Sequence, residues 1–375
     1  MALIDLIASV PADSTALVRP ESDFRLTYGA LQQRVEILAG ALADAGVQRN
    51  ERVAIALPDE PALVVAILAA STIGVAVSFD DRAVRAVILP AEAPDGMPRV
   101  QPCGVLGAES WVPGAERYLL GAIAPSTQHP APSTRSDPDD IAVILQTRGT
   151  TGPPKRVPLS HQNLTIAARQ TAARLGLGPT DVTLCVMPIA HVQGLVTATL
   201  ATLAAGGTVV IPGGFHPLTF WRLARDYGMT WFTATPTIHQ WLLARTADPG
   251  ARRPTGAARL RFIRSAGSTL PPAVARTLAS AFGVPVLDGY EVTEASGDVS
   301  ASRLAILDAD GRPLEPGSRG EVALAGPAVA RGYDNDPEST RKFFVDGWFR
   351  TGDFGYLDAR EQLTLVRDQG SGIRD

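Results

Sequence analysis

The chain has 375 residues, a formal net charge of −4 and a hydrophobic content of 45%. This is the composition of an ordinary globular protein with room for two or three cores, and its acidic balance argues against a nucleic-acid partner. The two cysteines, Cys103 and Cys185, are far apart and have no CxxC spacing, which argues against a disulfide framework or a zinc site. We therefore expect a protein of the reducing cytoplasm.

Two apolar segments could be mistaken for targeting or membrane signals. Residues 1–15 lack a basic start and carry Asp5 within the apolar stretch, so they predict a helix that packs on the surface. Residues 61–79 approach membrane-spanning length, but Gly74 divides them into a helical half and a β-branched half. We interpret this second segment as a buried helix followed by a strand.

The periodicity elsewhere predicts alternating strands and helices. Residues 27–46 have a helical spacing of apolar residues, and 52–57 form a short buried strand. The proline-rich stretch 123–140 predicts a mobile loop. Further strands are expected at 141–147, 182–187, 207–212, 230–234, 260–265 and 284–289, and further helices at 193–205, 217–227 and 271–282. This alternation favours an α/β fold with largely parallel sheets.

After residue 300 the pattern changes to short strands joined by DG, PG and DA turns. Such turns are typical of antiparallel hairpins. We therefore expect α/β subdomains over residues 1–300 and a small antiparallel β subdomain over 301–366.

The segment "TRGTTGPPK" (147–155) follows a buried strand and precedes the helix-capping sequence "SHQNL" (160–164). Its glycines allow backbone amides to approach an anion, while its threonines and lysine offer donors and a positive charge. These residues are Gly149, Thr150, Thr151, Gly152 and Lys155. The segment predicts phosphate binding, although it is not a Walker A loop and a plain surface turn is the alternative.

Three other segments carry candidate residues. His191, at the end of a strand, could line a cleft and meet an anionic substrate, but a lone histidine is also common in structural roles. In "LDGYEVTEASG" (287–297), Tyr290 could stack on a base, Thr293 could bond a phosphate and Glu294 could bind Mg²⁺. The alternative is an acidic helix N-terminus. Asp353, in "RTGD", could bind a diol or form an Asx-turn in a hairpin.

In this order and spacing, the four motifs together resemble those of the adenylate-forming superfamily of acyl-CoA synthetases, luciferases and peptide-synthetase adenylation domains. The family phrases appear here as "TRGTTGPPK", "IAHVQGL", "GYEVTE" and "RTGD", and residues 331–344 match the usual approach to the last phrase. Residues 207–243 look most like the oxalate-CoA-ligase-like branch.

The resemblance implies the family's large N-terminal domain, with two helix-flanked, mostly parallel sheets and a small antiparallel β subdomain. It also implies a reaction in which a small carboxylic acid attacks the α-phosphorus of ATP, with Mg²⁺, to give an acyl-adenylate and pyrophosphate. A thiol, from coenzyme A or from the phosphopantetheine of a carrier protein, would then displace AMP.

Roles for individual residues follow from the same resemblance. In the phosphate loop, it implies phosphate contacts from Thr147, Arg148, Gly149, Thr150, Thr151, Gly152 and Lys155. Glu294, assisted by Thr150, would carry Mg²⁺, Thr293 would contact the α-phosphate and His191 would border the acyl pocket. The nucleoside would lie against Ala266, Gly267, Ser268, Asp288, Gly289 and Tyr290, with Asp353 on the ribose hydroxyls.

The sequence departs from the family pattern in several places. Arg148 replaces a small residue and could either pair with a phosphate or fill the place of ATP; we favour pairing. Arg156 replaces a glycine and is expected to point to solvent, while Glu291 replaces a glycine and adds a carboxylate close to the phosphates. Residues 367–375 differ from the usual hinge, and we expect the family's lysine-bearing C-terminal domain to be missing or to act in trans. A non-catalytic relative that binds nucleotide or acyl ligands as a regulatory subunit is the alternative.

Overall fold

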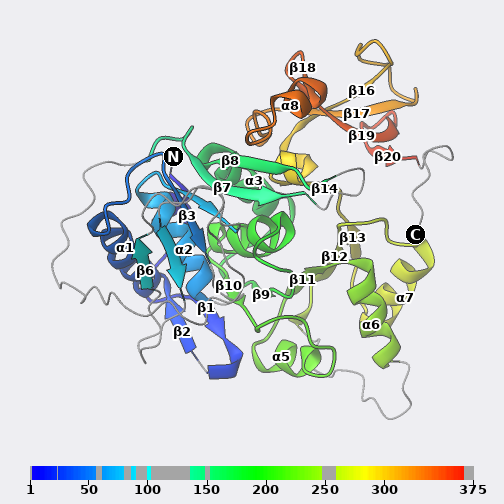
Figure 1. Ribbon diagram of the computed structural model, residues 1–375. Helices are drawn as coiled ribbons and strands as arrows, with labels where there is room; N and C mark the ends of the chain where they lie inside the picture. The colour runs from blue at the N-terminus through cyan, green and yellow to red at the C-terminus, as the bar shows by residue number, and fades with distance from the viewer. Residues whose placement is uncertain are drawn as a thin grey trace.

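The computed structural model describes residues 2–22, 24–55, 61–79, 86–89, 99–102, 136–147, 153–246 and 259–366. Two sheets flanked by helices make up the larger body, and a smaller antiparallel sheet stands at one side of it (Figure 1). Most of the predicted 123–140 loop, the altered hinge at 367–375 and the centre of the phosphate loop at 148–152 lie outside the described residues.

The seven-stranded sheet has the order β13-β12-β11-β9-β10-β1-β2. Its strands are β1 (Thr15–Arg19), β2 (Phe24–Thr27), β9 (Val182–Leu184), β10 (Thr208–Val210), β11 (Trp231–Ala234), β12 (Phe262–Ser265) and β13 (Val286–Asp288). All neighbours are parallel except β1 and β2. The chain passes from β9 to β10 on one side and then to β11 on the other, so its direction of progress reverses at β9. Ligands of open α/β sheets bind outside the carboxyl ends of the strands at such a reversal.

The six-stranded sheet has the order β6-β5-β3-β4-β7-β8. Its strands are β3 (Arg52–Ile55), β4 (Ala76–Ser78), β5 (Ala86–Leu89), β6 (Arg99–Pro102), β7 (Ile141–Gln146) and β8 (Arg156–Ser160). The sequence did not indicate β8, which runs antiparallel to β7 and pairs Arg156 with Gln146. The phosphate-loop segment is therefore the connection of a β-hairpin.

The predicted helices occupy the expected places along the chain. They are α1 (Tyr28–Asp44), α2 (Pro61–Thr72), α3 (His161–Arg174), η3 (Gln193–Leu200), α4 (Ala201–Ala204), α5 (Phe220–Asp226) and α7 (Pro272–Phe282). A further helix, α6 (Pro236–Thr246), was not predicted. The expected N-terminal helix is a single 3₁₀ turn, η1 (Leu3–Leu6), that buries both of its leucines. No helix in the described ranges has the length and apolarity needed to cross a membrane.

The small sheet is antiparallel, as predicted, and contains β16 to β20. Its strands are β16 (Arg303–Leu307), β17 (Gly320–Ala325), β18 (Phe344–Val345), β19 (Trp348–Leu357) and β20 (Leu363–Leu365). Helix α8 (Pro337–Phe343) precedes β18, and a two-stranded pair, β14 (Glu291–Val292) and β15 (Gly297–Asp298), connects the seven-stranded sheet to this part (Figure 1).

Candidate functional site

The neck of the predicted phosphate loop is closed by two hydrogen bonds. The Thr147 N–H donates to the Lys155 carbonyl at 2.9 Å, and the Lys155 N–H donates to Thr147 Oγ1 at 2.9 Å. These bonds fix the two ends of the hairpin connection between β7 and β8. Arg148, Gly149, Thr150, Thr151 and Gly152 lie outside the described residues, so their contacts with phosphate stay a prediction.

The Lys155 ammonium lies over two aromatic rings. Its Nζ is 4.8 Å from the centroid of Phe343 and 5.5 Å from that of Tyr333. Aromatic faces attract cations, so the two rings hold the ammonium beside the loop without neutralising its charge. The charge stays available for a phosphate.

Glu294 is 7% exposed and accepts a hydrogen bond of 2.7 Å from Tyr333 Oη on its Oε1. Burial raises the pKa of this carboxyl, while the Tyr333 hydrogen bond and the Lys155 charge act in the opposite direction. Tyr333 also contacts Lys155. Glu294, the predicted metal ligand, and Lys155, the predicted phosphate ligand, therefore share Tyr333 as a neighbour. Tyr333 was not among the site residues predicted from the sequence.

Tyr290 Oη donates a hydrogen bond of 2.5 Å to Asp353 Oδ2. Burial and the Asp353 charge both raise the pKa of Tyr290, so its hydroxyl stays protonated and able to donate. Asp353 was expected in a tight hairpin turn, but it lies inside β19, directly after Gly352 at φ +79°. The register of β17 and β19 is irregular at this point, which brings the carboxylate to Tyr290.

His191 borders a small cavity of about 110 Å³ that is also lined by Phe79, Ile144, Gln146 and Ala190. Gln146 immediately precedes Thr147, so this cavity lies next to the start of the predicted phosphate loop. Two residues after His191 the chain enters the π-helix η3, a rare geometry that often marks functional sites.

The tight entry into η3 requires a glycine. A Cβ on Gly194 would lie 2.2 Å from the Pro188 carbonyl oxygen. A larger cavity of about 280 Å³ lies between Arg52, Pro158, Tyr333 and their neighbours, and none of the predicted site residues line it.

The predicted nucleoside-side residues lie at the ends of neighbouring parallel strands. The Ala266 N–H donates to the Ala234 carbonyl at 3.1 Å, and the Gly289 N–H donates to the Ser265 carbonyl at 2.8 Å. Gly267 has a φ of +89°, so the turn that carries Ser268 requires it. Burial raises the pKa of Asp288.

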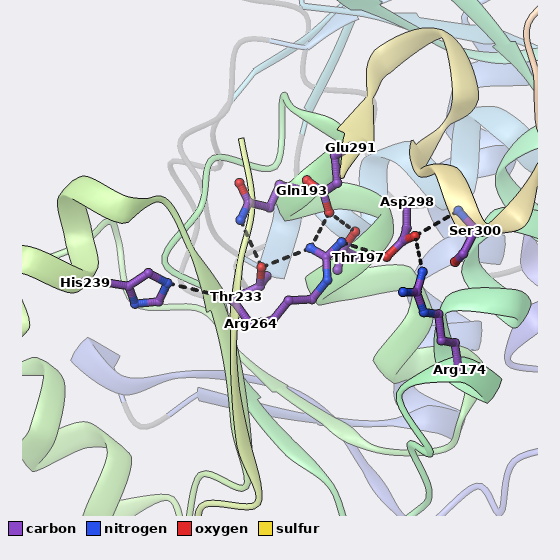
Figure 2. Close-up of polar contacts among 9 residues, drawn as sticks. All are labelled: Arg174, Gln193, Thr197, Thr233, His239, Arg264, Glu291, Asp298 and Ser300. Carbon is purple, nitrogen blue, oxygen red and sulfur yellow. Dashed lines mark hydrogen bonds and ion pairs between the residues drawn. The ribbon is translucent and has the colours of Figure 1, made fainter. Parts of the chain in front are cut away.

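Glu291 forms a buried ion pair that changes its expected effect on ATP. Arg264 Nη1 lies 2.6 Å from Glu291 Oε1, and Arg264 Nη2 lies 2.8 Å from Asp298 Oδ2. The arginine side chain is 1% exposed and both acidic side chains are 3% exposed. Figure 2 shows Arg264 between its two acidic partners. Arg264 therefore balances the added negative charge inside the protein. Neither Mg²⁺ nor Arg148 is needed to balance it.

The wider network joins several elements. Asp298 also accepts from Arg174 Nη1 at 2.9 Å, and Glu291 Oε1 accepts from Thr197 Oγ1 at 2.7 Å (Figure 2). Arg264 is a functional candidate that the sequence reading missed. The sequence did contain an indication of this role. Arg264 lies within the apolar strand 262–265, and an arginine that is buried there needs an acidic partner.

Arg156 is buried, not solvent-directed as expected. Its side chain is 11% exposed, and its Nε lies 3.1 Å from Asp334 Oδ2. Arg52 contacts the same carboxylate at 2.6 Å. The prediction was wrong because residues 156–160 were taken as part of a loop. They form β8, which pairs with β7 and places Arg156 against the 331–335 segment.

The donor set around Glu294 fits a magnesium ion held together with a nucleotide. Across the described ranges, no three His, Cys, Asp or Glu side chains gather into a metal cluster. Magnesium is commonly bound by one or two carboxylates together with substrate phosphates. A single buried carboxylate beside the lysine of a phosphate loop is such an arrangement.

Residues from four distant segments form two contacting groups. Lys155 contacts Tyr333, and Tyr333 bonds Glu294. Tyr290 bonds Asp353. The charge of Glu294 contributes to the raised pKa of Tyr290, so the two groups are neighbours.

Comparison with known proteins gives one family. The model of the AMP-binding enzyme family matches residues 6–86 and 80–334. The oxalate–CoA ligase of Arabidopsis thaliana is 39% identical over 275 residues, which cover 68% of this chain and 53% of that protein. The sulfoacetate–CoA ligase of Cupriavidus necator is 31% identical over 391 residues, which cover 96% of this chain and 76% of that protein. This chain spans about half the length of the first of these relatives.

A solved structure confirms the predicted fold class. The N-terminal domain of FACL13 from Mycobacterium tuberculosis has a TM-score of 0.80 and 23% identity, and the match covers 98% of this chain and 100% of that chain. At this identity the likeness establishes the architecture alone. The two helix-flanked sheets and the small antiparallel sheet are those of this fold.

Proposed function

Because the chain belongs to the AMP-binding enzyme family, we propose that it uses ATP to convert a carboxylic acid into an acyl-adenylate, with release of pyrophosphate. The observation that carries this proposal is the contact of Lys155 with Tyr333 and of Tyr333 with Glu294, with the bonded pair Tyr290–Asp353 as their neighbour. It offers a cation, a metal-binding carboxylate, an aromatic ring and a second carboxylate, which are the groups that a nucleoside triphosphate requires.

The chemical step needs no general base. A carboxylate oxygen of the substrate attacks the α-phosphorus, the bond from that phosphorus to the β-bridging oxygen breaks, and its electron pair leaves with pyrophosphate. The nucleophile is already an anion, so the protein contributes positioning and charge neutralisation. Lys155 supplies a positive charge to the phosphates, and Thr293 donates its hydroxyl to the α-phosphate.

Glu294 would hold Mg²⁺, which when bound neutralises phosphate charge. Tyr333 orients this carboxylate and favours its charged form through the 2.7 Å hydrogen bond. Burial acts in the other direction and raises the pKa of Glu294. The tyrosine therefore assists metal binding indirectly, as a positioning residue.

Recognition of the nucleoside and of the acid falls to the remaining predicted residues. Tyr290 would pack on the adenine and Asp353 would take the ribose hydroxyls, near the backbone of 265–269. His191 would border the acid, a role supported by the cavity that it shares with Gln146. A small acid is favoured because relatives are named for oxalate and sulfoacetate.

For the second half of the reaction we propose a thiol acceptor. Both relatives are named as CoA ligases, which supports coenzyme A. The phosphopantetheine of a carrier protein has the same reactive thiol and is the alternative acceptor. The thiolate would attack the acyl carbon and AMP would leave. Participation of a C-terminal domain acting in trans stays a prediction.

The decisive experiment is ATP–pyrophosphate exchange across a panel of small carboxylic acids, with Glu294→Gln as the matched variant. We expect exchange with at least one acid, and its loss by at least about a hundredfold in the variant. Exchange absent with every acid, while the protein still binds nucleotide, would favour the non-catalytic alternative. Glu291 is paired with Arg264 inside the protein, so it does not add an unpaired carboxylate that would argue against nucleotide binding.

A further inference from the structure

The Arg264 network lies near the point at which the chain changes direction across the seven-stranded sheet, because Arg264 and Gln193 both reach Thr233 of β11. Strand β9 has β10 on one side and β11 on the other, which makes its carboxyl end the point at which the chain changes direction across the sheet. His191 and Gln193 follow β9 at this point, and Gln193 Nε2 donates to Thr233 Oγ1 of β11 at 2.9 Å. Ligands of open α/β sheets bind in the crevice at such a switch point.

A buried acceptor marks the same place. Gln193 is 2% exposed, and its Oε1 has no hydrogen-bond partner within the described part of the chain. Buried polar atoms are nearly always bonded, so an orphan acceptor indicates where a ligand or water completes the structure. Figure 2 shows Gln193 and Glu291 on the same side of Thr233 and Arg264.

The positive charge of Arg264 is already paired with carboxylates. Arg264 Nη1 lies 2.6 Å from Glu291 and Nη2 lies 2.8 Å from Asp298. The flat face of the guanidinium rests on Gly289, where a Cβ would fall 2.2 Å from Nη2. With a second arginine, Arg174, on Asp298 at 2.9 Å, two arginines face two carboxylates, and the formal charges cancel.

We propose that the Glu291–Arg264 pair makes this chain select small acids whose acyl group is uncharged, and reject acids that carry a second negative charge. This inference rests on the proposed acid-activating function. In the absence of Glu291, Arg264 would offer a buried guanidinium to a second carboxylate or a sulfonate. With Glu291 present, Nη1 of Arg264 is already paired, and a second anion would lie beside the Glu291 carboxylate.

The test uses pairs of acids that differ in charge but hardly in size: oxalate with oxamate, malonate with malonamate, and succinate with succinamate. ATP–pyrophosphate exchange gives kcat/KM for each acid, and calorimetric titration in the presence of ATP gives its affinity. In the wild-type protein we expect each amide to exceed its dicarboxylate by at least about tenfold in both measurements.

Glu291→Gln removes the charge and keeps the size of the side chain. We expect it to lower the ratio of kcat/KM for the amide to kcat/KM for the dicarboxylate by at least about tenfold. Glu291→Gly is the second variant, in case the glutamine disturbs the fold. The matched control is Asp181→Asn. Asp181 pairs with Arg261 at 2.6 Å, and its side chain is also 3% exposed, but it lies at the amino ends of the same strands. The ratio should not change in this control.

The outcomes separate the two proposals. Equal or better use and binding of the dicarboxylates by the wild-type protein would overturn the charge selection while leaving acid activation intact. A ratio that shifts equally in Asp181→Asn and Glu291→Gln would also overturn it. Absence of exchange with every acid, together with a binding preference for the amides, would support the charge selection and refute the adenylation reaction.

Discussion

Tyr333 donates its phenolic hydroxyl to Glu294, with 2.7 Å between Oη and Oε1 in a buried environment. The bond stabilises the charged carboxylate and so lowers the pKa of Glu294, against burial, which raises it. Removal of the bond should therefore move this pKa upwards. A metal-binding carboxylate must be ionised, so under the proposed function we expect this hydrogen bond to set the acidic limit of activity.

Tyr333→Phe should shift the acidic limb of the pH profile for exchange to higher pH by about one unit, because a hydrogen bond to a charged group is worth about 1.5–3 kcal/mol. The variant should also require more Mg²⁺ at low pH, and approach wild-type behaviour at high pH. The measurement is kcat/KM for ATP against pH at several Mg²⁺ concentrations. A uniform loss at every pH would contradict the role given to this bond.

Lys155 and Lys342 provide a matched pair on the same aromatic ring. Their Nζ atoms lie 4.8 Å and 5.2 Å from the centroid of Phe343, but only Lys155 closes the neck of the phosphate loop. Lys155→Ala should reduce kcat/KM for ATP by about a hundredfold, as loss of a preorganised charge on phosphate does. Lys342→Ala should leave it within a factor of about two. Equal losses in both variants would show that the lysines act by packing on Phe343.

Under the proposed function, we expect the Tyr290–Asp353 bond to compete with the ribose for the Asp353 carboxylate. Its length is 2.5 Å, and Asp353 is otherwise exposed. Tyr290→Phe keeps the ring and removes the competing donor, so it should lower KM for ATP by about fivefold, the equivalent of one hydrogen bond. A higher KM would show instead that the hydroxyl holds Asp353 in its binding orientation.

Asp353→Asn tests the partner residue. The variant should raise KM for ATP and reduce the discrimination between ATP and 2′-deoxy-ATP, because it replaces one of the two accepting carboxylate oxygens by an NH₂ donor and removes the charge. Exchange rates with the two nucleotides provide the measurement. Unchanged discrimination would remove Asp353 from the ribose site.

Much of the fold could be predicted because its signals are local. The helix α1 places Leu31, Val35 and Leu38 at helical spacing, and all three are buried. Gly74 separates α2 from β4 because its φ of +70° suits a glycine. Strand β8 was missed because "RVPLS" is short and contains a proline, and only its pairing with β7 makes it a strand.

The site was less predictable where it depends on contacts between distant residues. The motif residues could be named from the sequence, but Tyr333 and Arg264 belong to none of the motifs. Arg264 meets Glu291 only because β12 and β14 come together in space. The burial of Arg156 against Asp334 was likewise invisible, because the two residues are joined by tertiary structure alone.

His161 and His239, both buried, predict a loss of stability in mild acid. Burial lowers the pKa of His161 from 6.5 to about 4, and the same cause lowers the pKa of His239 to about 4. Between these values the unfolded chain binds protons that the folded chain does not, so folding is fully favoured above pH 6.5 and loses stability as the pH falls towards 4. Each histidine accounts for about 3 kcal/mol at most.

His161→Asn isolates one of these contributions. The Leu3 N–H donates to His161 Nδ1 at 3.0 Å, and an asparagine oxygen can accept the same bond without titrating. The variant should therefore lose stability less steeply than the wild-type protein between pH 6.5 and 4 in denaturant titrations. The exposed His216 supplies the control, since His216→Asn should leave the slope unchanged. A slope equal to that of the wild-type protein in His161→Asn would mean that His161 is not the group that takes up the proton on unfolding.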